Sequence, residues 1–171
     1  MMKNPTISSP FERALHYLTK LDDYSKVSQY SFTAETFQLE RVRNLLNSLK
    51  NPQNAFPVVH IAGTKGKGST AVLLAQALQE AGYRTGLFTS PFLQSACEQI
   101  QIGGQTIPEH DFSRLVERMK PFLALDHGIT FFEAMTALAF LFFMENHVNI
   151  AIVETGLGGL TDATNVIEPL L

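Results

Sequence analysis

The sequence predicts an α/β fold in which a parallel sheet carries helices on both faces. Short apolar runs rich in β-branched residues have the composition of buried strands, and stretches with helical spacing of apolar residues lie between them. Such alternation of strands and helices is typical of parallel sheets. The strands are expected at 57–62, 84–89 and 149–154, and the helices between them at 70–81, 108–119 and 130–144.

The remaining segments predict two further helices and a hairpin. Apolar spacing indicates helices at 11–21 and 37–50, and Asn51-Pro52 ends the second. Strand-like sequence on either side of Gly103-Gly104 predicts a hairpin over 99–107. Residues 1–10 and 22–36 are expected to be a tail and a loop. Three core strands are few for such a sheet, which suggests a truncated unit.

Composition is that of a globular domain and excludes several classes of protein. The 171 residues are 45% hydrophobic and 17% charged, so they can bury a core. A net charge of −3 without a basic cluster argues against nucleic-acid binding. The most apolar segment, 134–144, is too short to cross a bilayer, so no membrane partner is expected.

Cysteine usage and the N-terminus indicate a cytoplasmic protein. Cys97 is the single cysteine and cannot form an internal disulfide, which fits a reducing compartment. The first residues lack the apolar stretch of a secretory signal. The five histidines show no metal-ligand spacing. We expect a monomer that binds small molecules.

A glycine-rich segment between the first strand and the next helix predicts an ATP site. Glycines allow successive backbone N–H groups to face one anion, and the helix N-terminus attracts negative charge. Lys67 would contact the terminal phosphates, and a hydroxyl from Ser69 or Thr70 could reach Mg²⁺. The spacing departs from the strict G-x-x-x-x-G-K-[ST] pattern. The expected nucleotide ligands are Gly63, Thr64, Lys65, Gly66, Lys67, Gly68, Ser69 and Thr70.

Two oxygen-bearing side chains follow the other parallel strands. Glu154 ends the third strand, and Ser90 follows the second. Ligands of open α/β sheets bind at the carboxyl ends of the strands, and Mg²⁺ prefers such hard oxygen donors. We therefore assign Glu154, with Lys67, as catalytic and Glu154 as a metal ligand. The Ser90 hydroxyl is a candidate metal or phosphate ligand, although a lone Ser before Pro is most often only a turn residue. Asp162 and Asn165 could be simple turn formers.

Several segments in order resemble the folylpolyglutamate and dihydrofolate synthases of the Mur-ligase superfamily. These segments are Phe37–Arg41, Asn51-Pro52-Gln53, His60–Thr70, Thr89-Ser90-Pro91, Thr130–Glu133 and Glu154–Val166. The resemblance implies an ATP-dependent ligase that joins L-glutamate to dihydropteroate or folate through an acyl phosphate, with ATP and Mg²⁺ as cofactors. It also implies a pteroate-type site lined by Thr36, Phe37, Gln38, Leu39, Thr130, Phe131, Phe132, Glu133, Thr161, Asp162 and Ala163.

The chain departs from the family pattern in sequence and in length. Arginine-like charges common after Thr89-Ser90-Pro91 are absent, and Leu160 replaces a common arginine. Family members are more than twice as long. We therefore expect residues 1–171 to be a single N-terminal ATP-binding portion without the C-terminal glutamate-binding domain. The alternatives are a non-catalytic ATP-binding fragment and a P-loop NTPase-like binding module.

Overall fold

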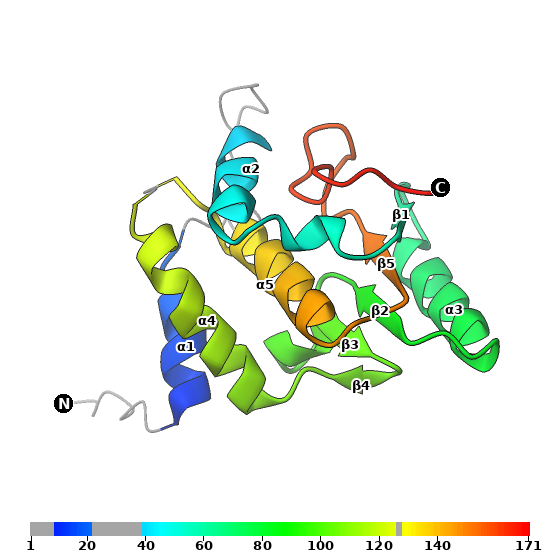
Figure 1. Cartoon of the computed structure of the whole chain (residues 1–171), viewed down its shortest axis with the longest axis horizontal. Coiled ribbons are helices and arrows are strands. Elements are labelled where there is room, and N and C mark those ends of the chain that lie inside the picture. Colours follow the sequence, from blue (N-terminus) through cyan, green and yellow to red (C-terminus); the bar gives the residue numbers. More distant parts are fainter. Residues whose placement is uncertain (1–8, 22–38, 126–127) are drawn as a thin grey trace.

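The computed structural model describes residues 9–21, 39–125 and 128–171 (Figure 1). In chain order the elements are α1 (Pro10–Leu18), α2 (Leu39–Ser48), the 3-10 turn η2 (Pro52–Asn54), β1 (Val58–Ile61), α3 (Lys67–Glu80), β2 (Thr85–Phe88), η3 (Ala96–Gln99), β3 (Ile100–Ile102), β4 (Gln105–Thr106), α4 (Glu109–Leu123), α5 (Phe131–Glu145) and β5 (Ile150–Glu154). Of the tail expected at 1–10, residues 1–8 lie outside the described residues, as does the loop expected at 22–36. Ser9 and Pro10 do not continue the tail, because Ser9 caps α1 and Pro10 is its first residue.

The five strands form one mixed sheet in the order β1-β5-β2-β3-β4. The three predicted core strands are parallel, with β5 between β1 and β2. The expected parallel sheet is confirmed for these three strands only, because β3 runs antiparallel to β2 and β4 antiparallel to β3. The physical reason is local: the chain returns along β2 after η3, and the predicted Gly103-Gly104 turn then reverses it again.

Helices cover both faces of the sheet, as predicted. On one face, Ala71 and Ala75 of α3 pack against Leu87 and Ile152 from the central strands. On the other face lies α5, and a Cβ added at Gly86 of β2 would meet the Phe143 ring at 3.0 Å. Figure 1 shows α3 on one side of the strands and the other helices together on the opposite side.

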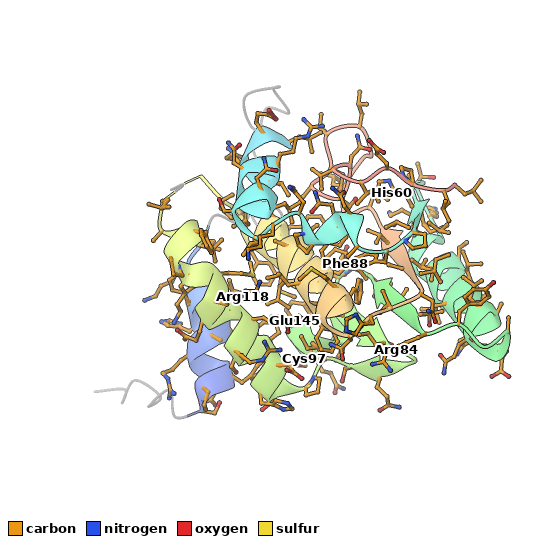
Figure 2. All side chains as sticks on the ribbon, viewed as in Figure 1. His60, Arg84, Phe88, Cys97, Arg118 and Glu145 are labelled. Atoms are coloured by element: carbon orange, nitrogen blue, oxygen red, sulfur yellow. The ribbon has the colours of Figure 1, made fainter. Side chains whose placement is uncertain are left out.

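Helix α5 is apolar around its whole circumference because it is enclosed on all sides. Eleven successive residues, Glu133–Phe143, are buried. The sheet covers one side of α5, while α2, α4 and η2 cover the others. At its exposed end, Glu145 binds Arg114 and Arg118 of α4 at 2.7 and 2.5 Å (Figure 2). Within the described residues, no helix combines the length and apolarity needed to cross a membrane.

Two helix boundaries differ from the predicted ones for identifiable reasons. Helix α3 begins at Lys67 rather than at Thr70, because Gly66 takes a left-handed conformation (φ 77°) and ends the preceding loop. Helix α4 continues past Met119 to Leu123 and accommodates Pro121 near its end. Met119 and Leu123 are both buried, so packing extends the helix across the proline.

A reciprocal cap fixes the start of α5. The Thr130 Oγ1 atom accepts a hydrogen bond from the Glu133 N–H at 3.2 Å, and the Glu133 carboxylate accepts one from the Thr130 N–H at 2.6 Å. Both residues are buried. This capping box satisfies two backbone donors that water cannot reach.

Replacing Thr130 with alanine should therefore destabilise the protein by about 1 kcal/mol, the usual effect of losing an N-cap hydroxyl. Thr130→Ser, which keeps the hydroxyl, is the control and should unfold close to the wild-type midpoint. Urea denaturation followed by circular dichroism measures both. Equal midpoints for Thr130→Ala and the wild type would contradict this role of the cap.

Candidate functional site

The carboxyl ends of the three parallel strands bring the predicted site residues to one edge of the sheet. In the strand register, Ile61 of β1 pairs with Glu154 of β5, and Phe88 of β2 pairs with Val153. The glycine-rich segment expected to bind phosphate (residues 63–70, called the phosphate loop for that expectation) follows β1, and Ser90 lies two residues beyond β2. Glu154, Ser90 and the phosphate loop therefore lie at the same edge, as the sequence predicts.

The phosphate loop ends in the first turn of α3. Gly66 is the N-cap residue and has no side chain to cap the turn, and the first helical bond runs from the Thr70 N–H to the Gly66 carbonyl at 2.9 Å. The first N–H groups of a helix have no partner within the helix. The first turn of α3 consists of Lys67, Gly68 and Ser69. The backbone N–H donors of this turn and the partial positive charge of the helix N-terminus suit an anion.

The Glu154 carboxylate packs directly against this turn. A Cβ added at Gly68 would lie 3.3 Å from Glu154 Oε2 and 3.6 Å from Oε1. The carboxylate therefore lies beside the residue between Lys67 and Ser69. The Ser90 N–H donates to Glu154 Oε2 at 3.1 Å, and Glu154 is only 4% exposed. The Glu154 carboxylate, fixed by the Ser90 N–H, thus joins the ends of β2 and β5 to the start of α3.

The donor atoms at this edge fit a hard divalent cation. Glu154 supplies a carboxylate, and hydroxyl groups come from Ser90 and from Ser69 or Thr70 at the start of α3. Among the described residues, no group of three or more His, Cys, Asp or Glu side chains could hold a metal by itself. This donor set suits Mg²⁺, which keeps several waters and shares phosphate oxygens rather than using an all-protein cage.

The post-β5 loop (residues 155–165) is organised around Asp162. Asp162 Oδ2 accepts the Leu157 N–H at 2.8 Å, and Oδ1 accepts the Thr164 N–H at 3.0 Å and the Thr164 hydroxyl at 2.5 Å. Asp162 is 4% exposed and Ala163 is 8% exposed, whereas Thr161 is exposed. Of the predicted ligand residues 161–163, only Thr161 thus presents its side chain to solvent.

The start of α5 reaches the same loop through Phe132. A Cβ added at Gly156 would lie 2.7 Å from Phe132 Cζ, so the aromatic ring occupies the space beside that glycine. The Phe132 ring also packs on Phe88, with ring centroids 5.7 Å apart. Phe132, from a segment that the resemblance places in the substrate site, therefore lies beside the start of the loop that carries 161–163. The roles of 130–133 and 161–163 as ligand contacts stay predictions.

Glu133, at the start of α5, already has structural partners. It caps the helix, and its Oε1 atom lies 3.4 Å from Arg41 Nη2. Burial raises the pKa of the Glu133 carboxyl, which the bond from the Thr130 N–H and the Arg41 charge oppose. Phe131 is half-buried at the first turn of α5, and Leu39 is half-buried at the start of α2. The other three predicted ligand residues, Thr36, Phe37 and Gln38, lie outside the described residues.

Two polar features near the site are not apparent from the sequence pattern. His60 Nε2 of β1 lies 2.7 Å from Thr164 Oγ1, although the two residues are 104 positions apart (Figure 2). Glu98 accepts the backbone N–H groups of Leu93, Gln94 and Ser95, and the first of these bonds is the main cause of the lowered pKa of its carboxyl. Glu98 thereby orders the segment after Ser90.

The chain is similar to known folylpolyglutamate and dihydrofolate synthases. No protein-family model matches the chain. A dihydrofolate synthase/folylpolyglutamate synthase of Bacillus subtilis (strain 168) is 47% identical over 139 residues, which are 78% of this chain and 32% of that protein. The crystal structure of a Thermotoga maritima folylpolyglutamate synthase matches 94% of this chain and 36% of its own, with a TM-score of 0.83 and 38% identity.

A solved FPGS–AMPPCP–folate complex matches 94% of this chain and 38% of its own, with a TM-score of 0.82 and 33% identity. The chain thus spans about a third of the length of these proteins. The chain is therefore homologous, over most of its own length, to folylpolyglutamate/dihydrofolate synthases, and it corresponds to a part of those proteins.

Proposed function

We propose that this chain is the ATP-binding portion of a ligase that joins L-glutamate to the carboxylate of dihydropteroate or a folate. The observation that carries the proposal is the Glu154 carboxylate packed against Gly68 at the start of α3. Homology over most of the chain, and the nucleotide and folate present in a homologous complex, support the choice of substrates.

The start of α3 would bind the phosphates of ATP. Its backbone N–H groups and the helix dipole favour an anion, and Lys67 adds a full positive charge in the first turn. Lys67 is half-buried, whereas residues 62–66 are exposed and open to a ligand. Positive charge fixed at this position would stabilise the negative charge that develops during phosphoryl transfer.

Glu154, Ser90 and the hydroxyl of Ser69 or Thr70 would hold Mg²⁺. When bound, the ion would neutralise phosphate charge and act as a Lewis acid. The chain's own contribution is to hold the carboxylate in place, since the Ser90 N–H fixes Oε2 and burial excludes competing water. A carboxylate that is already oriented loses little conformational freedom when it binds a ligand.

The proposed reaction explains why a ligase needs this site. A carboxylate is a poor acyl donor because its leaving group would be an oxide ion. Attack by the substrate carboxylate on the γ-phosphorus of ATP breaks the β–γ P–O bond, releases ADP and gives an acyl phosphate. The glutamate amine then attacks the acyl carbon, the C–O bond to phosphate breaks, and the amine loses a proton. The start of α3 would serve the first step.

The segments 130–133 and 161–163 would shape the pteroate-type site. Phe132 packs beside Gly156 at the start of the loop that carries 161–163, and its ring offers an aromatic surface suited to stacking. Glu133 and Asp162 use their carboxylates for internal hydrogen bonds. These two carboxylates would therefore contribute to ligand binding by fixing the shape of the segments. Their remaining lone pairs could also accept hydrogen bonds from the ligand.

A second candidate is a non-catalytic ATP-binding module. The observation favouring it is that the contacts of the Glu154 carboxylate with Gly68 and with the Ser90 N–H would organise a nucleotide site without involving a substrate segment. Titration calorimetry with ATP·Mg²⁺ and with dihydropteroate separates the candidates. Binding of both supports the ligase portion, binding of ATP·Mg²⁺ alone supports the module, and binding of neither contradicts both. Glutamate-dependent ADP release measures whether the chain alone completes the reaction, and we expect at most weak activity.

Lys67→Ala should weaken ATP·Mg²⁺ binding by about ten- to a hundredfold, because it removes a charge-assisted contact to phosphate. Lys20→Ala, which removes the same charge from an exposed position after α1, is the control and should bind like the wild type. Calorimetry measures both affinities, and circular dichroism checks the fold. Unchanged affinity in Lys67→Ala would refute the phosphate role.

Gly68→Ala tests the position of the carboxylate. The added Cβ would lie 3.3 Å from Glu154 Oε2, so the carboxylate must shift, while alanine favours the helix by about 1 kcal/mol over glycine. We expect the gain in ATP affinity caused by Mg²⁺ to fall severalfold without loss of thermal stability. Affinity without Mg²⁺ is the internal control. An unchanged Mg²⁺ effect would show that Glu154 does not hold the ion.

A further inference from the structure

We propose that His60 is a positioning residue that fixes the post-β5 loop against β1, through Thr164 and Asp162, and so sets the pteroate-type site beside the phosphate loop. The role in substrate binding rests on the proposed function. His60 lies on β1, and the phosphate loop begins at residue 63, shortly after that strand. Its side chain thus joins the strand that leads into the phosphate loop to a loop 104 residues further along the chain.

The hydrogen-bond directions follow from the groups involved. Thr164 Oγ1 lies 2.7 Å from His60 Nε2 and 2.5 Å from Asp162 Oδ1. An ionised carboxylate can only accept, so the single hydroxyl hydrogen of Thr164 goes to Asp162. The hydroxyl oxygen must then accept from His60, which requires a proton on Nε2. Figure 2 shows His60 on the side of the molecule where the post-β5 loop lies.

The hydrogen bond from His60 to Thr164 does not depend on whether the ring is neutral or protonated. Burial lowers the pKa of His60, while the negative charge of Asp162 opposes that shift. The neutral ring therefore dominates at neutral pH, and its one proton is held at Nε2. Protonation at Nδ1 would leave the Nε2–H in place, so the link persists on both sides of the pKa.

The chain of bonds continues into the loop that carries Thr161. Asp162 Oδ2 holds the Leu157 N–H, the Asp162 N–H donates to the Gly159 carbonyl at 3.1 Å, and Asn165 Nδ2 donates to the Leu160 carbonyl at 2.9 Å. These internal bonds set the shape of the loop. The His60 bond adds a side-chain link between that shape and β1. Thr164 is 0% exposed and Asp162 is 4% exposed, so solvent does not substitute easily for the link.

The test compares His60→Leu, which removes the donor, with His60→Gln, whose side-chain amide can donate to Thr164. In ¹H–¹⁵N spectra, the amides of 157–162 should shift or broaden in His60→Leu and stay close to wild type in His60→Gln. Dihydropteroate affinity should fall about tenfold in His60→Leu and less than threefold in His60→Gln, and ATP·Mg²⁺ affinity should change little in either. In the wild type, long-range ¹H–¹⁵N spectra should show the His60 Nε2–H tautomer.

Coupling to Thr164 gives an independent check. Thr164→Val removes the hydroxyl that His60 contacts, so adding His60→Leu to Thr164→Val should lower dihydropteroate affinity no further. Additive effects, unchanged 157–162 amides in His60→Leu, or an Nδ1–H tautomer would each overturn the proposal. An equal loss of both ligands together with a lower melting temperature would show a general structural role instead, which also overturns it.

The proposed function and this inference fail in different ways. If the wild type binds neither dihydropteroate nor ATP·Mg²⁺, the proposed function fails. The effect of His60 on the 157–162 amides and its tautomer then still decide whether the positioning link exists. If the wild type binds both ligands but His60→Leu matches it in affinity and spectra, the inference alone is wrong.

Discussion

The contact between the Glu154 carboxylate and the first turn of α3 is the constraint on which the site depends. Glycine at position 68 allows a buried carboxylate to approach the helix backbone, and the Ser90 N–H fixes one of its oxygens. A negative group so close to a helix N-terminus is favourable in itself. The same carboxylate thus joins the end of β5 to the segment after β2 and to the start of α3.

The order of the strands explains why these groups meet. With β5 between β1 and β2, the three parallel strands end together. This brings together Glu154 at the end of β5, Ser90 shortly after β2, and Lys67 at the start of the helix that follows β1. The apolar helix α5 packs against the carboxyl ends of these strands. Phe132 fills the space beside Gly156, and the Thr130–Glu133 cap fixes the start of the helix. Packing, capping and site geometry are therefore parts of one arrangement.

Much of this arrangement is predictable from the sequence, because it depends on local patterns. Apolar runs and helical spacing indicate the three core strands, the hairpin and the helices, and strand-end polar residues indicate the site edge. The antiparallel edge and the start of α3 at Lys67 are not predictable in this way. The first depends on how η3 returns the chain, and the second on the left-handed conformation of Gly66. The contact between His60 and Thr164 joins residues 104 apart, which no local pattern reveals.

The most direct measurement is a crystal structure with AMPPCP and Mn²⁺ in place of Mg²⁺, with the metal located from its anomalous signal. The account predicts an anomalous peak in contact with a Glu154 carboxylate oxygen, at about 2 Å as for other octahedral oxygen sites. It also predicts phosphate oxygens on the N–H groups at the start of α3. A nucleotide bound elsewhere, or a metal peak remote from Glu154, would contradict it.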